Sequence, residues 1–291
     1  MRLIVSLMMA MMIALPLSVD SAVSAGAAEN PASGSSEPLS LFAINVGKAD
    51  SLLLRSGENA YLIDTGRGRT SDSVEDALAM LGVTSLDAVI ITHMDSDHVG
   101  GLKKLLKSDI RVSTVCIPPF FLPEDDKKDE NPAYKAAKKQ NVEIVRLNAG
   151  DELPLEGGVL RVLGPLRAAT DKEDNNSLVL LAETSAGRML LCGDMEFPEE
   201  ADLLAAGVIP QADVLKIPNH GDNDATSEAL LQAVQPRAAV ISTSTEEKES
   251  TPARRVMRLL QSRNVEIWQT QDTELGVLLT LQNGELTVHT Y

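Results

Sequence analysis

Four ionisable side chains of the kinds that bind metals fall within six consecutive positions of the chain: His93, Asp95, Asp97 and His98. In extended backbone, alternate side chains point the same way, so the first three can converge on one side while His98 approaches a neighbouring point. Two imidazoles and two carboxylates gathered there would repel one another or stay unpaired unless a cation lay among them. The spacing predicts a metal site, with two adjacent divalent ions.

The alternative is a solvated turn, because Asp and Ser favour turns for reasons of their own. The chain has only four histidines in 291 residues, however, and two of them fall in this window. An apolar run at 86–91 predicts a buried strand in front of the cluster, and a short helix at 102–107 follows Gly100 and Gly101. Ligand-type residues at this density after a strand favour the metal site.

Two further strand ends carry residues that can complete the site. An apolar strand at 188–192 ends in Gly193 and Asp194, where the glycine lets the carboxylate turn out at the tip. An aspartate there can bridge two cations, although Asp is also a good helix N-cap. His220 follows a strand at 214–217 in the same rhythm, whereas a lone histidine is more often structural or exposed.

The central cluster also resembles a known family. Its pattern, H-x-D-x-D-H from His93 to His98, resembles the H-x-H-x-D-H signature of the metallo-β-lactamase superfamily, with Asp95 in place of the second His. That variant, together with Gly100 and Gly101, is similar to the hydrolase domain of ComEC-like competence proteins and their free-standing secreted relatives. In this family the aspartate of an apolar-Gly-Asp stretch similar to the one at Asp194 bridges the metals.

The chain departs from that resemblance at three places. Asn219 replaces the first His of the ComEC-like His-His-Gly-Ser stretch, and Asp222 replaces its Ser, which leaves Asn219 to hydrogen-bond substrate or solvent. The superfamily commonly supplies one more histidine between the central cluster and the bridging aspartate, and here none exists between His98 and His220. Residues before the strand at 177–183 could offer oxygen instead or merely form a turn: Asp171, Asp174, Asn175 and Asn176.

By analogy with the family, one ion is held by His93, Asp95 and Asp194, and the other by Asp97, His98, Asp194 and His220. The first set is rich in oxygen, which weakens the case for zinc there and admits manganese. We expect two divalent ions, zinc or manganese, with Asp97 and His220 as catalytic residues. Candidates that would orient a ligand, contact the substrate or serve only a local structural role are Asp50, Asp64, Asn176, Lys216 and Asn219.

Strands and helices alternate along the chain. Strands are predicted at 39–44, 51–55, 60–63, 86–91, 112–117, 142–147, 153–155, 159–163, 177–183, 188–192, 214–217, 238–242, 265–269, 276–281 and 286–290, and helices at 71–81, 102–107, 199–206, 227–233 and 252–263, the last capped by Ser250 or Thr251. The lysine-rich segment 124–139 is predicted to be a solvated face or a surface insertion. The pattern predicts an α/β fold of two sheets back to back, flanked by helices. The resemblance implies the same αββα sandwich with two mixed sheets, as one domain over residues 39–291.

The N-terminus predicts a cleavable signal peptide at 1–28: Arg2 gives a positive start, residues 3–17 are apolar, and residues 21–28 are rich in small side chains. Residues 29–38 then form a flexible leader. An uncleaved anchor is the alternative, but the apolar run is short for a spanning helix. We expect a secreted or periplasmic protein with no stable membrane anchor after cleavage.

The composition limits the kinds of partner that the protein can bind. A formal charge of −16 argues against broad binding to a phosphate backbone, and 3% aromatic residues argue against stacking platforms for single strands. Any anionic substrate must be attracted locally. Cys116 and Cys192 could pair, but their apolar contexts favour buried free thiols.

No Ser-His-Asp nucleophile set is evident, so metal-activated hydrolysis is the expected chemistry. We expect a hydrolase of phosphodiester or related ester bonds, with a small or polymeric substrate; the resemblance favours phosphodiesters, DNA included. Two alternatives stay open. The incomplete histidine set and Asn219 motivate a metal-binding module that has lost catalysis. β-Lactam hydrolysis ranks last, because Asp95 makes the first metal set unlike that of typical lactamases.

Overall fold

The structure is a computed structural model that describes residues 36–121 and 131–291. These residues belong to one compact unit, Ser35–Tyr291. The predicted signal peptide at 1–28 and residues 29–35 of the leader lie outside the described residues, and so do residues 122–130 of the lysine-rich segment. Within the described ranges, no helix is long and apolar enough to cross a membrane.

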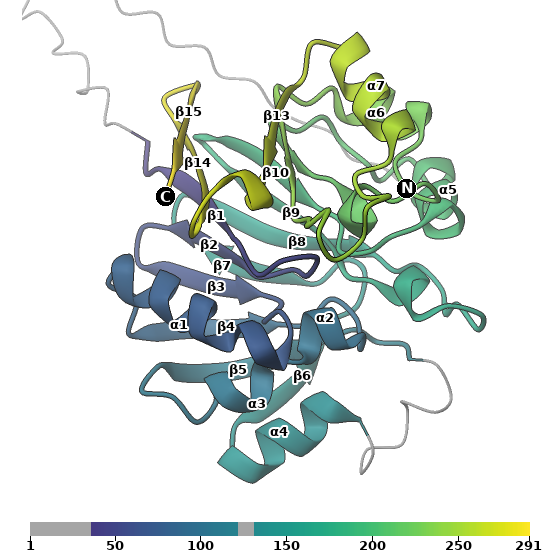
Figure 1. Ribbon diagram of the computed structural model, residues 1–291. Helices are drawn as coiled ribbons and strands as arrows, with labels where there is room; N and C mark the ends of the chain where they lie inside the picture. Colours follow the sequence, from purple (N-terminus) through teal and green to yellow (C-terminus); the bar gives the residue numbers. More distant parts are fainter. Residues whose placement is uncertain (1–35, 122–130) are drawn as a thin grey trace, which may run out of the picture. The chain divides into compact units, whose positions relative to one another are not determined.

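Two sheets form the framework, as predicted. The first has eight strands in the order β15-β14-β1-β2-β3-β4-β5-β6, and the second has seven in the order β13-β12-β11-β10-β9-β8-β7 (Figure 1). The first sheet contains β1 (Leu39–Ile44), β2 (Leu52–Ser56), β3 (Asn59–Ile63), β4 (Ser85–Ile90), β5 (Arg111–Ile117), β6 (Glu143–Arg146), β14 (Gly276–Gln282) and β15 (Glu285–Thr290). The second contains β7 (Glu152–Leu155), β8 (Gly158–Gly164), β9 (Val179–Thr184), β10 (Gly187–Leu191), β11 (Val214–Lys216), β12 (Ala238–Ile241) and β13 (Glu266–Gln269).

Both sheets are mixed. Strands β3 to β6 run parallel in the first sheet, and β10 to β13 run parallel in the second, while the other pairs are antiparallel. Parallel strands need crossover connections, and these carry helices to the outer faces. The helices are α1 (Ser71–Met80), α2 (Ser96–Val99), α3 (Leu102–Leu105), α4 (Pro132–Gln140), α5 (Phe197–Ala205), α6 (Glu228–Val234) and α7 (Arg254–Ser262).

Three apolar clusters hold the layers together. Residues from both sheets, among them Leu54 of β2 and Leu180 of β9, form the cluster between the sheets. On the outer face of the first sheet, α1, α3 and α4 bury side chains such as Leu78. On the outer face of the second sheet, α5, α6 and α7 do the same, for example through Leu230. Burial on both faces of each sheet explains the continuous apolar runs in the sequence and confirms the αββα sandwich.

Helices α7 and α4 differ from the prediction. The last helix, α7, begins at Arg254 with Ala253 as its N-cap, rather than at Pro252 behind Ser250 or Thr251. The cause is that the backbone N–H of Ala253 donates to the carbonyl oxygen of Gly221 (2.8 Å), so the chain there still belongs to the loop.

The lysine-rich segment is not wholly a solvated insertion. Its second half forms α4, with Pro132 in the first turn and Asn131 as a cap whose side chain accepts from two backbone N–H groups. Ala133, Ala136 and Ala137 recur at helical spacing and are buried against the first sheet, which the alternating charges around them hid in the sequence.

Candidate metal centre

The predicted site residues come from the carboxyl ends of parallel strands in both sheets. Asp64 follows β3, the segment 91–99 follows β4, Asp194 follows β10, and His220 follows β11. The carboxyl ends of parallel strands are where open α/β sheets gather their ligands. One local difference matters: Asp97 and His98 lie in the short helix α2 rather than in extended chain, because the N–H groups of His98 and Val99 donate to the carbonyl oxygen of Asp95.

His98 is fixed by a buried carboxylate. Its Nδ1 lies 2.8 Å from Asp64 Oδ2, and both side chains are fully buried. Asp64 also accepts from the backbone N–H of Thr92 (2.8 Å) and from the Thr92 hydroxyl (2.7 Å). Because an ionised carboxylate only accepts, the proton between the pair resides on His98 Nδ1. The other ring nitrogen, Nε2, is left to face the interior of the site.

His220 is fixed in the same way by a different acceptor. Its Nδ1 donates to the backbone carbonyl of Ser242, 2.9 Å away, and a carbonyl can only accept. Both Asn219 and His220 have positive φ angles, 46° and 53°. This left-handed conformation is costly for residues other than glycine and is characteristic of functional sites, where the surrounding structure enforces it. Here it turns the imidazole back toward the end of β10.

His93 completes the set through a hydroxyl. Its Nδ1 lies 3.1 Å from Thr92 Oγ1 and 3.3 Å from Ser177 Oγ. The Thr92 hydroxyl proton is given to Asp64, so this oxygen accepts from His93. All three imidazoles therefore present Nε2 to the site. The pKa of His93 is lowered to about 4 by burial and by the neighbouring His98, which leaves the ring neutral at pH 7.

Asp194 lies between two of the rings. Its Oδ2 is 3.2 Å from His98 Nε2 and 3.1 Å from His220 Nε2. Burial alone would raise the pKa of Asp194, but His220 and His98 hold it well below its usual range. Among the described residues, the Nε2 atoms of His93, His98 and His220 and the Oδ1 atom of Asp194 have no hydrogen-bond partner. Buried polar atoms are seldom left so, and together they have the donor chemistry of a metal site.

Gly193 is needed for this placement. Its φ is +52°, and a Cβ there would lie 3.0 Å from Thr92 Cβ and 3.1 Å from Ser177 Cβ. Those two residues hold His93, and the Ser177 hydroxyl also accepts from the backbone N–H of Asp194 (3.1 Å). A larger residue at 193 would push on the groups that orient the ring.

Two basic side chains, Arg67 and Lys48, hold Asp97. Arg67 Nη2 donates to Asp97 Oδ2 (2.9 Å), and Lys48 Nζ lies 3.5 Å from the same oxygen, which is also 3.9 Å from His220 Nε2. Burial would raise the pKa of Asp97, but His98 and His220 lower it, so the carboxylate is ionised. Sequence reasoning missed Lys48 and Arg67. They lie in the turns after strands β1 and β3, where only Asp50 and Asp64 were singled out from the sequence.

Asp174 lies beside His93. It lies in a short 3₁₀ turn, Glu173–Asn176, with Oδ1 3.7 Å from His93 Nε2. Burial raises its pKa to about 7, with further contributions from Asp194 and Asp95. The sequence offered four residues of this stretch as oxygen donors, and the structure brings Asp174 to the site. Asn176, in contrast, binds the backbone of Ala169 and the Glu173 carboxylate.

The remaining candidates, Asp50, Lys216 and Asn219, pair with groups other than the Nε2 atoms of the rings. Lys216 and Asp50 form a fully buried ion pair (2.7 Å), and Asp50 Oδ1 is 3.7 Å from His220 Nδ1. Lys216 is closed off from any substrate. Asn219 donates to Glu196 and Asp224 (3.4 Å each), away from the rings. His289 is exposed on β15, and Cys116 and Cys192 are buried free thiols, as their contexts predicted.

The donor atoms form sets that fit cations. Ligand atoms within 4.8 Å of one another come from four groups that share members: His93, Asp95 and Asp174; Asp97, His98 and His220; His93, His98 and Asp194; and Asp50, Asp64 and His98. The first two match the two predicted half-sites, with Asp174 added, and Asp194 belongs with a histidine of each. Burial would lower the pKa of His98, but Asp194 and Asp64 raise it well above its usual value, and the same negative field favours a metal cation.

Comparison with known proteins agrees with this geometry. The model of the metallo-beta-lactamase superfamily matches residues 44–245. The metallo-beta-lactamase fold protein YhfI from Bacillus subtilis superposes with a TM-score of 0.52 at 11% sequence identity, covering 80% of this chain and 96% of that protein. The chain belongs to the metallo-β-lactamase superfamily.

Within the superfamily, the chain is related to competence proteins. ComE operon protein 3 of Bacillus subtilis (strain 168) is 32% identical over 246 residues, which are 78% of this chain and 31% of that protein. Competence protein ComA of Neisseria gonorrhoeae is 25% identical over 228 residues, which are 78% of this chain and 30% of that protein. The chain spans about a third of the length of these relatives. The ComEC-like resemblance is thereby confirmed.

Proposed function

We propose that this protein is a metal-dependent hydrolase of phosphodiester or related ester bonds. One observation carries the proposal: three buried imidazoles engage acceptors through Nδ1 and turn Nε2 toward carboxylates, His98 and His220 toward Asp194 and His93 toward Asp174. Among the described residues, Asp194 Oδ1 and the Nε2 atoms of all three rings have no hydrogen-bond partner, and buried polar atoms left in this way cost free energy. A pair of divalent cations, zinc or manganese, would satisfy all of these atoms at once.

The side chains have distinct parts in this proposal. His93, Asp95 and Asp174 would hold one cation, Asp97, His98 and His220 the other, and Asp194 both. When bound, such a pair supplies hydroxide near neutral pH, by lowering the pKa of water toward ~7. Arg67 and Lys48 fix the orientation of Asp97 and add positive charge beside the site. That charge favours an anionic substrate such as a phosphodiester, despite the net charge of −16.

The substrate class and the location of the protein are inferred from its relatives and from its N-terminal sequence. The matched relatives are named for competence, and this favours nucleic acid among the phosphodiesters. The sequence of residues 1–28 supports export, so we propose that the protein acts outside the cytoplasm without a membrane anchor after cleavage.

Hydrolysis of bis-p-nitrophenyl phosphate and of DNA, with Mn²⁺ or Zn²⁺ added, tests the proposal. Asp97→Ala should lower kcat/KM by at least about a hundredfold, because it removes a ligand and one of the two acidic partners of Arg67. Asp109→Ala, a change on an exposed residue, serves as the control. Equal rates for wild type and Asp97→Ala would refute hydrolysis at this site.

The two alternatives are outcomes of the same experiment. Tight metal binding without turnover of any ester would leave a metal-binding module, while hydrolysis of nitrocefin in place of phosphodiesters would indicate a lactamase. The position of Asp174 beside His93 weakens the first alternative. That alternative was motivated by the missing histidine, and Asp174 offers an oxygen donor next to His93 instead.

A further inference from the structure

A groove lies on the opposite side of the loop that carries the metal-binding residues. It has a volume of about 450 Å³ and runs between α2 and α3 on one side and α4 on the other. This volume falls within the range of about 300–1,000 Å³ typical of small-molecule sites. The lining residues used below are Met94, Val99, Lys103, Lys135, Ala136 and Lys139.

The groove combines an apolar floor with a basic rim. Met94, Val99 and Ala136 form the floor and are each at least nine-tenths buried. Lys103 on α3 and Lys135 and Lys139 on α4 are exposed, and the two on α4 are four residues apart and so share one helix face. Within residues 36–121 and 131–291, none of the three lysines forms an ion pair or a side-chain hydrogen bond.

This concentration of positive charge is unusual for the molecule. Asp and Glu outnumber Lys and Arg by 42 to 26. Many of the surface cations are paired, as Arg161 is with Glu152 and Lys172 is with Glu196. Three neighbouring ammonium groups repel one another unless an anion lies among them. The charge complementarity points to an anionic occupant with more than one negative group.

The groove and the metal centre share one stretch of the chain, residues 93–100. Met94 alternates with His93 and Asp95, and Val99 follows His98 within α2. Consecutive Cα atoms are only about 3.8 Å apart, so a ligand that spans the edge of this loop reaches both places. A polymer that crosses this edge would therefore contact the groove and the metal centre together.

We propose that this groove binds the phosphates that flank the scissile bond in a single-stranded oligonucleotide substrate. The inference rests on the proposed hydrolase function and adds where the polymer runs. Lysine ammonium groups act as point charges and an aliphatic floor offers no base-specific hydrogen bonds, so binding is independent of sequence and sensitive to salt. The three lysines are the specificity-determining residues for polymeric over small substrates.

Binding is tested with a fluorescein-labelled phosphorothioate decathymidylate, which keeps its charge and resists cleavage. The groove variant carries Lys103→Gln, Lys135→Gln and Lys139→Gln. The control variant carries Lys104→Gln, Lys107→Gln and Lys138→Gln, an equal change of charge on lysines of the same region that do not line the groove. In the metal-loaded full-length protein, the groove variant should bind at least tenfold more weakly at 50 mM KCl. The slope of log Kd against log salt concentration should be smaller by about 2 in the groove variant, because each of the three lost phosphate contacts contributes about 0.7.

Kinetics separate this inference from the proposed function. The ratio of kcat/KM for unmodified decathymidylate to that for bis-p-nitrophenyl phosphate should fall at least tenfold in the groove variant and stay constant in the control. Equal binding by groove variant and wild type, or an equal loss in the control, would overturn the groove. If the wild type cleaves neither substrate, the proposed function fails, while the binding measurement still decides the groove.

Discussion

Three histidines in this protein have Nδ1 engaged by three different kinds of acceptor. His98 uses the Asp64 carboxylate, His220 uses the Ser242 carbonyl, and His93 uses the Thr92 hydroxyl. Each acceptor binds Nδ1–H and leaves Nε2 as the donor atom for a cation. Neighbours of this kind fix the tautomer and orientation of metal-binding histidines and raise their basicity.

Asp64→Asn tests this residue-scale point. The amide cannot accept from His98 and from both Thr92 donors at once, so the ring loses its fixed orientation. We expect the affinity for Mn²⁺ or Zn²⁺ to fall about 10- to 100-fold in a competition titration with a chelating dye. Asp72→Asn, on the exposed face of α1, should leave the affinity unchanged. Thermal unfolding with EDTA present separates lost metal affinity from lost stability, and an unaltered affinity in folded Asp64→Asn would contradict the assignment.

Residue types alone predicted much of the site and stopped short at definite points. Strand ends bearing His93, Asp194 and His220 could be read from apolar runs that end in ionisable residues. The backbone carbonyl that fixes His220 could not, because every residue carries one. Asp174 was one of four equivalent oxygen donors until the turn placed it, and Arg67 acquires meaning only because the chain folds its side chain onto Asp97.

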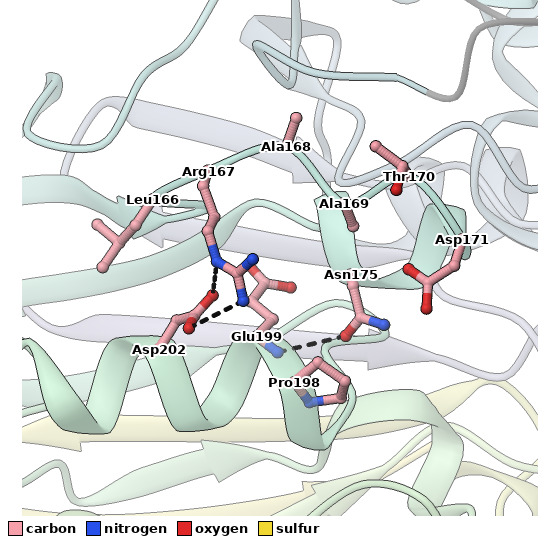
Figure 2. A pocket seen from close by; sticks show the side chains of 10 residues that line it. All are labelled: Leu166, Arg167, Ala168, Ala169, Thr170, Asp171, Asn175, Pro198, Glu199 and Asp202. Atoms are coloured by element: carbon pink, nitrogen blue, oxygen red, sulfur yellow. Dashed lines mark hydrogen bonds and ion pairs between the residues drawn. The ribbon is translucent and has the colours of Figure 1, made fainter.

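At the scale of elements, helix α5 contains a buried acid that the metal centre does not use. Glu199 lies in the first turn of α5 and lines a pocket of about 330 Å³. Its backbone N–H donates to Asn175 Oδ1, and at the same pocket Arg167 pairs with Asp202 (Figure 2). Neither oxygen of the Glu199 carboxyl group has a hydrogen-bond partner among the described residues. Burial, with the nearby Asp202, raises its pKa well above the usual range.

This raised pKa predicts how stability depends on pH. The folded state binds the Glu199 proton more tightly than the unfolded state, whose pKa is about 4.3. The resulting stabilisation is complete below that value and is lost as the pH rises through the folded-state pKa. Glu199→Gln keeps the shape without the titration, so its free energy of unfolding relative to wild type should rise between pH 4 and pH 8. We expect a relative gain of at least about 1.4 kcal/mol, one pKa unit, by urea denaturation. A difference independent of pH would refute this.

Element boundaries were predictable where local signals and packing agreed. The strands of both sheets are continuous apolar runs because both of their faces are covered, and β1 and β15 were placed within a residue. The predicted start of helix α7 lies too early in the chain. The backbone N–H of Ala253 donates to the carbonyl oxygen of Gly221, which is far away in sequence, and this hydrogen bond keeps Ala253 in the loop. Helix α4 was read as solvent-exposed, because three small alanines carry its entire buried face.

At the scale of the whole molecule, the two sheets are joined by an apolar core and also by the predicted metal-binding residues. The first sheet supplies His93, Asp97 and His98, and the second supplies Asp194 and His220. Carboxylates and imidazoles from the two sheets meet in a buried space. The negative charges of the carboxylates destabilise the folded state there unless cations balance them. Metal binding should therefore stabilise the fold as a whole.

Metal removal tests that expectation. A cation present at 100 times its Kd adds about 2.7 kcal/mol to the free energy of unfolding, and each kcal/mol moves the Tm of a domain this size by about 2–4 °C. We expect EDTA to lower the Tm by about 5–10 °C, and added Mn²⁺ or Zn²⁺ to restore it. His289→Ala, which alters the histidine exposed on β15, should keep the full shift. A Tm that is indifferent to chelation would contradict a link between the ligand set and the packing of the sheets.

The most direct test of the whole account is the number of metal ions bound per chain. Calorimetric titration of Mn²⁺ into chelator-treated protein, with elemental analysis of the product, should give two ions for the wild type. Because Asp194 lies between His98 and His220 and groups with His93, Asp194→Ala should retain at most one, while Asp109→Ala retains two. Two ions bound equally tightly by Asp194→Ala, or none bound by the wild type, would contradict it.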